Sequence, residues 1–238
     1  MDYVNVLDEI LLSNNVVDNF YNKYSNDVEF KNWLDNVLPE INMCELQQQN
    51  NPWHKYNVLG HILHSVEEIN KQTTNLDFDI RRMLAYIMLY HDIGKPACYI
   101  TREKDGKIID SFYNHNVESE KVFGRTASVF GFNHNQIEIM AKLIFKHDIF
   151  MFIRAFKTDN PYWRTLTYKL VKEEIEDLNA VGIGCELLKY LIMVGRSDNR
   201  AQNEKMTADS LKLLDKFDEM LENVARGIKW KYFSLVKV

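Results

Sequence analysis

Nine segments with apolar residues at helical spacing constrain the fold of this chain most. Their apolar side chains recur at i, i+3 or i+4, and i+7, so each segment can bury one face of an α-helix. The segments run through 3–12, 27–37, 56–70, 79–91, 117–130, 135–147, 162–179, 184–197 and 207–224. With nine glycines and four prolines in 238 residues, the chain has few of the turn residues that many short strands would need. We therefore predict an all-α fold, a helical bundle.

One segment departs from the helical period. The stretch "CYITREKDGKIIDSFYNH", residues 98–115, alternates polar and apolar side chains and carries Asp105-Gly106 at its middle. An Asp-Gly pair between alternating residues is typical of a tight β-turn. The sequence therefore predicts a small β-hairpin inserted between helices.

The chain is predicted to form one folded unit, because it has no internal repeat, low-complexity tract or Gly/Ser linker. Residues 1–37 would form a helical cap, 38–205 the main domain, and 206–238 a C-terminal helix and tail packed on it. The tail, Arg226 to Val238, has four basic, three aromatic and no acidic residues. Such a tail could hold single-stranded RNA, but packing against the body or dimerisation is its more usual role.

Composition narrows the possible partners and compartment. The formal net charge of −5 argues against general DNA binding, although a local basic groove stays compatible with it. Three widely spaced cysteines, Cys44, Cys98 and Cys185, show neither CxxC spacing nor a disulfide framework. No run of about 18 apolar residues and no basic signal-peptide region is present in the sequence. We expect a cytoplasmic protein without a membrane partner.

The apolar run Met83 to Tyr90 ends in two polar side chains, His91 and Asp92. A buried carboxylate beside an imidazole is costly unless both are paired. The pair therefore marks either the exposed end of a helix or a metal site.

Other predicted helices also end an inward apolar face in a side chain that can bind metal. These faces are Leu84, Ile87 and His91; Met140, Leu143 and His147; and Leu191, Val194 and Asp198. Val58 places His61 on or beside a further inward face. A core does not hold four or five unpaired polar groups, and a shared divalent metal would satisfy them all. Periodicity alone does not establish that these helices converge.

The order of these motifs resembles the HD superfamily of metal-dependent phosphohydrolases, and most closely the HD domain of bacterial-type CCA-adding tRNA nucleotidyltransferases. The resemblance covers residues 38–202. It rests on "LPEINMCELQQQNNPWHKYNVLGHILHSVEEI", then "HDIGKP", the Asp-Gly hairpin, "FYNHNVES", "IFKHD" and "GRSDNRAQ", in that order. The resemblance implies an HD-domain helical bundle with a small β-hairpin insertion, with 38–205 as the phosphohydrolase domain.

Departures from that family are also informative. The nucleotidyltransferase head, with its Gly-Ser and paired acidic ligands, is missing, and the first 37 residues are too few to hold it. We therefore expect no CCA addition but hydrolysis by an HD unit alone. Other HD branches fit worse, since the chain has no Glu-Asp after His91-Asp92, no Gly-Tyr-Pro motif, and Gly94-Lys95 in place of Gly-His.

The resemblance also implies a ligand set and a chemistry. His61, His91, Asp92 and Asp198 would form a first metal site, and Asp92 could bridge to a second ion held by His115 and His147. One or two divalent ions would serve as cofactor, with Mn, Ni, Co, Fe, Mg and Zn all open. An ion lowers the pKa of its water, and two ions can clamp the attacking and leaving oxygens of a displacement.

Several residues near these motifs are candidates for substrate contacts. Asp92 and Lys95 are the candidate catalytic residues, and Lys95 could offer a positive charge to phosphoryl oxygens. Alternatively, Lys95 could be a solvated loop lysine. Arg196 and Arg200 flank Asp198 and would bind phosphate or pair with surface acids. His54 would touch substrate or orient a ligand. His64 and His134 match no ligand position and read as structural residues.

Three functions remain open on the sequence. The favoured one is an enzyme, a metal-dependent phosphoesterase (phosphodiesterase) acting on a nucleotide or RNA-end phosphate: a 2′,3′-cyclic phosphodiester, a 2′-nucleotide or a phosphomonoester. The second is an HD-fold phosphohydrolase of another phosphorylated small molecule. The third is a non-catalytic metal-binding module. It is the weakest of the three, because every ligand position is filled. The sequence does not predict the oligomeric state.

Overall fold

Eleven α-helices dominate the computed structural model, which describes residues 2–104 and 106–227. They are α1 Tyr3–Leu11, α2 Val16–Asn26, α3 Val28–Val37, α4 Glu40–Leu46, α5 Val58–Thr73, α6 Phe78–Tyr90, α7 His115–Thr126, α8 His134–Lys146, α9 Tyr168–Leu178, α10 Gly184–Arg200 and α11 Glu204–Ala225. Three 3₁₀ helices lie between them: η1 Lys95–Cys98, η2 Ala127–Phe130 and η3 His147–Phe152. The predicted all-α fold is confirmed.

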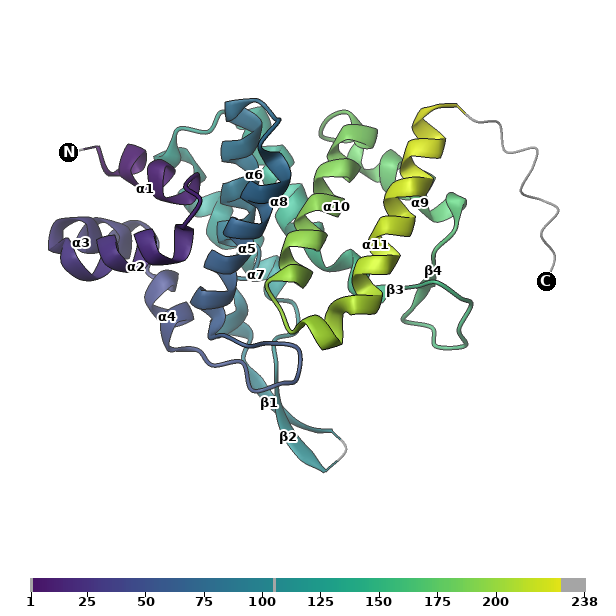
Figure 1. Ribbon diagram of the computed structural model, residues 1–238, viewed down its shortest axis with the longest axis horizontal. Helices are drawn as coiled ribbons and strands as arrows, with labels where there is room; N and C mark the ends of the chain where they lie inside the picture. Colours follow the sequence, from purple (N-terminus) through teal and green to yellow (C-terminus); the bar gives the residue numbers. More distant parts are fainter. Residues whose placement is uncertain (1, 105, 228–238) are drawn as a thin grey trace.

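The helices form three groups along the long axis of the molecule (Figure 1). Helices α1–α4 gather at one end, where α2 packs on α5 and α1 contacts α6. Helices α5–α8 lie in the middle, and α9–α11 at the other end. Helix α10 packs against both α5 and α11, so it joins the middle group to the last one.

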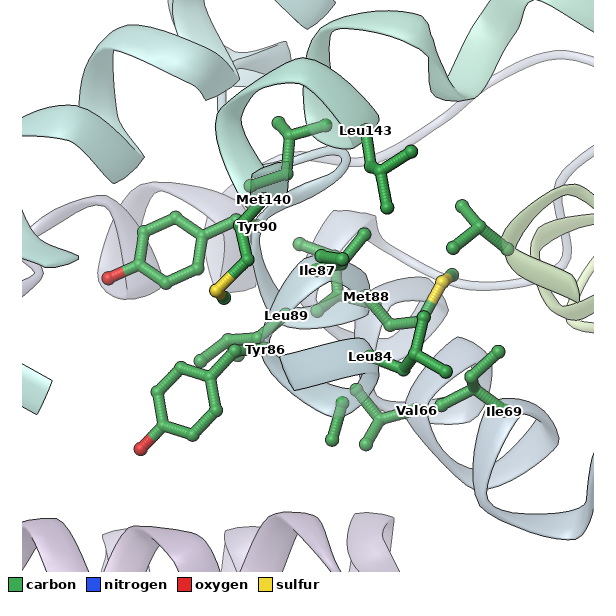
Figure 2. Packing of buried hydrophobic residues seen from close by; sticks show 14 of the residues in the cluster. Val66, Ile69, Leu84, Tyr86, Ile87, Met88, Leu89, Tyr90, Met140 and Leu143 are labelled. Carbon is green, nitrogen blue, oxygen red and sulfur yellow. The ribbon is translucent and has the colours of Figure 1, made fainter. Parts of the chain in front are cut away.

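Helix α6 carries the longest uninterrupted run of buried residues in the middle group. All its residues from Met83 to Tyr90 are buried, and Val66 and Ile69 of α5 and Met140 and Leu143 of α8 are buried around it (Figure 2). A helix that is apolar on all sides has no face for water and must be surrounded by other elements. The His-Asp pair that follows it therefore begins inside the protein.

The predicted hairpin is also present. Strands β1 (Ile100–Lys104) and β2 (Lys107–Ser111) pair antiparallel, with Ile100 opposite Ser111 and Lys104 opposite Lys107. Gly106 has φ +72°, which a side chain rarely adopts and which the tight turn requires. The hairpin projects below the helices in Figure 1.

Two helices and one strand pair were not predicted. Helix α2 is rich in Asn and Asp, which favour turns, although its buried Val16, Phe20 and Tyr24 follow a helical period. Helix α4 has seven residues and is too short to show periodicity. The predicted helix over 162–179 begins only at Tyr168, because β4 (Arg164–Thr165) pairs in parallel with β3 (Ile153–Arg154).

The C-terminal part of the chain is only partly described. Helix α11 packs on α10 and α9. Residues 228–238, most of the basic and aromatic tail, lie outside the described residues. Within 2–104 and 106–227, no helix combines the length and the apolar character needed to cross a bilayer.

Candidate metal centre

Six side chains that can bind metal meet where five helices of the bundle approach one another. His61 lies in α5, His91 ends α6 and is followed by Asp92, and Asp198 lies in α10. His115 begins α7, and His147 follows the end of α8. Two overlapping groups result, one of His61, His91, Asp92 and Asp198, and one of Asp92, His115 and His147.

The first group is compact. Nε2 of His61 lies 3.1 Å from Oδ2 of Asp92 and 3.0 Å from Oδ1 of Asp198. Nε2 of His91 lies 3.3 Å from Nε2 of His61 and 3.3 Å from Oδ2 of Asp92. Atoms bound to one ion at about 2.0–2.2 Å lie roughly 3.0–3.5 Å apart. The spacing of this group therefore suits a shared ion.

Asp92 belongs to both groups through different oxygens. Its Oδ2 faces the first group, whereas its Oδ1 lies 3.0 Å from Nε2 of His115 and 3.6 Å from Nε2 of His147. The Nε2 atoms of His115 and His147 are 3.2 Å apart. This is the position expected of a carboxylate that bridges two ions.

Backbone carbonyls fix the orientation of three of the four imidazoles. The Nδ1–H groups of His91, His115 and His147 each donate to the carbonyl oxygen three residues earlier, at 2.7 Å in every case. Because a carbonyl only accepts, the proton of each neutral ring stays on Nδ1 and its Nε2 carries a lone pair. His91 and His147 also lie at the carbonyl ends of α6 and α8, where the helix dipole favours a cation.

This orientation leaves acceptors facing acceptors. Nε2 of His115 and Nε2 of His147 face each other across 3.2 Å, and neither neutral ring has a proton to share there. The contact becomes favourable when a cation lies between the atoms or when one ring is protonated. The donor set of imidazole nitrogens and carboxylate oxygens thus fits a divalent transition metal.

The pKa shifts in the first group also favour a bound cation. Burial opposes ionisation of Asp92, but Lys95 and His91 outweigh it and hold the pKa of that carboxyl well below its usual range. For Asp198, hydrogen bonds from His61 and His91 likewise overcome burial and keep its pKa well below the usual value. Burial lowers the pKa of His91, but Asp92 and Asp198 reverse this and raise it to about 10. Two ionised carboxylates in a buried site require positive charge close by.

Lys95 is part of this buried site. Its side chain is 7 % exposed, and its Nζ contacts Oδ2 of Asp92 at 2.6 Å and Oε1 of Gln49 at 2.9 Å. The alternative of a solvated loop lysine is therefore wrong. In this structure the ammonium neutralises Asp92 directly, and Gln49 holds it in place.

His54 lies in the loop between α4 and α5 and covers the first group from outside. Its ring meets the ring of His61 edge-on, with centroids 5.1 Å apart. Its Nδ1 is buried and has no hydrogen-bond partner among the described residues. Burial lowers the pKa of His54 well below its usual range, so the ring is neutral at pH 7. His54 is thus placed to orient His61 or to meet a group bound beside it.

The two arginines that flank Asp198 lie away from the site. Two residues along a helix turn about 200°, so Arg196 and Arg200 project from the side of α10 opposite Asp198. Arg196 donates to Asp215 and Asp218 of α11 at 2.9 Å each. Of the two predicted roles of Arg196, pairing with surface acids is the one observed. Arg200 is exposed at the end of α10.

One residue of the site was missed by the sequence analysis. Oδ2 of Asp148 lies 3.1 Å from Nε2 of His115, and its Oδ1 lies 3.5 Å from Nε2 of His147. A signal was present, because His147-Asp148 repeats the His91-Asp92 dipeptide at a second helix end. Asp148 gives the second group a carboxylate of its own.

The remaining histidines and cysteines lie outside the centre. The ring of His64 stacks on Tyr56, and its Nδ1 lies 3.3 Å from a Glu67 carboxylate oxygen. His134 is exposed at the start of α8. Cys44, Cys98 and Cys185 are free thiols. His64 and His134 thus lie outside both ligand groups, and of the three cysteines only Cys44 is buried.

Comparison with known proteins assigns no family to this chain. No family model matches it, and no curated protein matches it. The arrangement itself carries the functional argument: two buried groups of His and Asp, joined through Asp92, could hold metal ions.

Proposed function

We propose that this chain is a metal-dependent phosphoesterase of the HD superfamily that acts on a nucleotide or RNA-end phosphate. The observation that carries the proposal is the pair of His/Asp groups that share Asp92, one through each carboxylate oxygen. A pair of ions a few ångströms apart is the usual arrangement for in-line displacement at phosphorus. The motif order from His61 to Asp198 supports the superfamily.

His61, His91, Asp92 and Asp198 would hold one ion, and Asp92, His115 and His147 a second. Bound ions would lower the pKa of a water and draw negative charge from the phosphoryl oxygens. The imidazole-rich donor set favours Mn, Fe, Co, Ni or Zn over Mg, which prefers oxygen ligands.

The chain's own residues supply the rest of the site. Lys95 holds Asp92 ionised and adds a fixed positive charge beside the place where a phosphate would bind. His54 presents a neutral ring over His61, where it could donate to or accept from a substrate oxygen. Buried apolar side chains of α5, α6 and α8 surround the site and keep bulk water away from its polar groups.

The decisive experiment measures hydrolysis of 2′,3′-cyclic AMP, 2′-AMP and p-nitrophenyl phosphate with added Mn, Ni or Co, and with EDTA. His61→Ala should abolish metal-dependent turnover. His64→Ala removes a histidine one turn further along the same helix and outside the centre, so it should leave turnover unchanged. Turnover that survives in His61→Ala, or that is insensitive to EDTA, would contradict the proposal.

A further inference from the structure

The β1–β2 hairpin sorts its charged side chains between its two faces. Residues directly opposite in an antiparallel pair share a face, and successive residues along a strand alternate. Lys104 lies opposite Lys107, and Arg102 stands two residues before Lys104. Among the described hairpin residues this face therefore carries three basic side chains and no acidic one. Glu103 and Asp110 lie on the other face.

Two aromatic rings lie on the same side as these basic groups. Nζ of Lys104 is 5.3 Å from the centroid of the Trp53 ring, and Cζ of Arg102 is 5.8 Å from the centroid of Tyr113. Tyr113 is 57 % exposed. We name Arg102, Lys104, Lys107, Trp53 and Tyr113 the basic–aromatic face.

Among the described residues, no carboxylate pairs with the positive charges of this face. Arg102 donates to the hydroxyl of Ser111 at 2.7 Å, and every residue of β1 is exposed. None of Arg102, Lys104 and Lys107 forms an ion pair with a carboxylate within residues 2–104 and 106–227. In a chain of net charge −5, a face of this kind is a local exception that would attract an anion.

The face is continuous with the metal centre. Trp53 directly precedes His54, whose ring meets His61. The loop that carries both is fixed on two sides, since Asn50 N–H donates to Asp110 of the hairpin at 2.6 Å and Asn203 N–H donates to the Trp53 carbonyl at 2.8 Å. Lys95 adds a contact from inside, with its Nζ 5.6 Å from the ring of Phe112 at the hairpin base.

We propose that the basic–aromatic face binds a single-stranded oligonucleotide whose terminal phosphate enters the metal centre; this rests on the proposed phosphoesterase function. Cations alternating with accessible rings suit a single strand, because its phosphates follow the cations and its bases stack on the rings. A five-residue strand extends about 17 Å, so the outer half of the hairpin would contact nucleotides beyond the one that reacts. The substrate class is then an oligonucleotide end, and a free mononucleotide would use only part of the surface.

Binding of a fluorescein-labelled 12-nucleotide RNA, followed by anisotropy, tests this inference, with DNA of the same sequence as a second arm. The variant Arg102→Ala/Lys104→Ala/Lys107→Ala should bind RNA at least about tenfold more weakly near 0.1 M salt. The slope of log Kd against log salt should fall by about 2, since each phosphate contact on a single strand contributes about 0.7. Equal RNA and DNA affinities would support a face that binds single strands without distinguishing ribose from deoxyribose. Tighter RNA binding would support a face that contacts the ribose 2′-hydroxyl.

A matched control separates local from overall charge. Lys169→Ala/Lys212→Ala/Lys216→Ala removes three exposed charges from α9 and α11 and should change the affinity less than about twofold. Trp53→Ala should weaken binding without changing the salt slope, because stacking involves no counterion release. Equal affinities of the two triple variants, or no oligonucleotide binding by the unmodified chain, would overturn the inference.

Activity measurements distinguish the two proposals. The hairpin triple variant should keep its kcat/KM for 2′,3′-cyclic AMP and lose it for an RNA that ends in a 2′,3′-cyclic phosphate. If the unmodified chain hydrolyses neither, the phosphoesterase proposal fails, and the binding titration still decides whether the face holds a strand. If both RNA and mononucleotide hydrolysis are unchanged in the triple variant, only the oligonucleotide inference fails.

Discussion

The two ligand groups of the metal centre share Asp92 but are built on different scaffolds. The first takes His61 and Asp198 from within α5 and α10, and His91 and Asp92 from the end of α6, and these three helices pack directly against one another. The second takes them from the start of α7 and the end of α8, which also pack on each other, so both of its histidines lie at a helix end. The segment after His147 leads into exposed Met151 and Phe152, 57 % and 48 % exposed.

This difference predicts unequal affinities. Ligands within packed helices, such as His61 and Asp198, are held in place before an ion arrives, so little order is lost on binding. The first group also offers four side chains, whereas the second has three, with Asp148 beside them. We expect one tightly held ion in the first group and a weaker, exchangeable ion in the second.

The largest effect is expected from Asp92→Ala, which removes the residue common to both groups. Both ions should be lost, and kcat/KM should fall on the order of 1,000-fold or more. Lys95 would remain buried without its carboxylate, which costs roughly 3–5 kcal/mol of folding stability in comparable cases. Elemental analysis and thermal unfolding check both parts, with Asp209→Ala on the exposed side of α11 as the control.

The next change separates the two groups. His61→Ala should release the ion that survives desalting, with a loss in affinity beyond the roughly 10- to 100-fold caused by outer-shell changes. His115→Ala should leave that ion in place and abolish only the weaker binding phase. Calorimetric titration with Mn distinguishes them. If His115→Ala released the tight ion and His61→Ala did not, the proposed order of affinities would be reversed.

A pH dependence follows from the first group. In the metal-free protein the pKa of His91 is raised to about 10, so at pH 7 its Nε2 is protonated and a metal must displace that proton. Affinity should therefore rise about tenfold per pH unit up to pH 10. Affinity that does not change between pH 6.5 and 9 would show that no proton is displaced.

The same group gives the metal-free protein an opposite trend in stability. Because the pKa of His91 is raised in the folded state, its protonation stabilises the folded protein. This stabilisation is complete below the unfolded pKa of about 6.5 and is lost as the pH rises toward 10. The Tm in EDTA should thus fall from pH 6.5 to 9.5. In excess Mn the fall should be smaller or reversed, because metal binding strengthens over the same range.

A glycine two residues after the shared Asp92 tests how closely the segment after α6 must approach α7. A Cβ on Gly94 would lie 2.5 Å from the carbonyl oxygen of His115 and 2.6 Å from the backbone nitrogen of Ser119. Backbone atoms cannot move aside locally, so Gly94→Ala should push α7 away from α6 at a cost of about 1–3 kcal/mol. The second ion should bind about tenfold more weakly and the first should be little affected.

Gly124, within α7, provides the matched control. A Cβ there meets nothing within 4 Å. Gly124→Ala should leave both ions in place and stabilise α7 by about 0.5–1 kcal/mol, since alanine loses less conformational freedom in a helix. Equal effects of the two substitutions on the second ion would mean that close packing at Gly94 does not position His115.

The sequence predicted most of the fold because helical periodicity is a local signal. Most of the long helices and the hairpin turn at Gly106 follow from residue spacing alone. Helix α4 is too short for a period to show, and the pairing of β3 with β4 joins residues eleven positions apart without any alternating pattern. Both depend on tertiary contacts that a local pattern does not contain.

The candidate site was predicted in part for the same reason. Inward-facing positions gave His91, His147 and Asp198, but only the packing of helices shows that they converge. Arg196 lies outside the site because two residues along α10 correspond to a rotation of about 200° about the helix axis. Its side chain therefore points away from Asp198 and pairs with α11. Asp148 was missed because it lies beyond the last periodic residue of α8, in η3, where no helical face predicts its direction.

Asp148 gives the smallest expected effect and the finest test of the two groups. Its oxygens contact His115 and His147 but not the first group, so Asp148→Asn should weaken only the second ion. The amide keeps the size of the side chain and removes its charge, and we expect a loss of about tenfold, as for outer-shell carboxylates. Calorimetric titration of Mn should show an unchanged tight phase and a weakened second phase. If Asp148→Asn weakened the second phase as much as His115→Ala does, Asp148 would be a direct ligand, and the two groups would hold their ions with equal numbers of side chains.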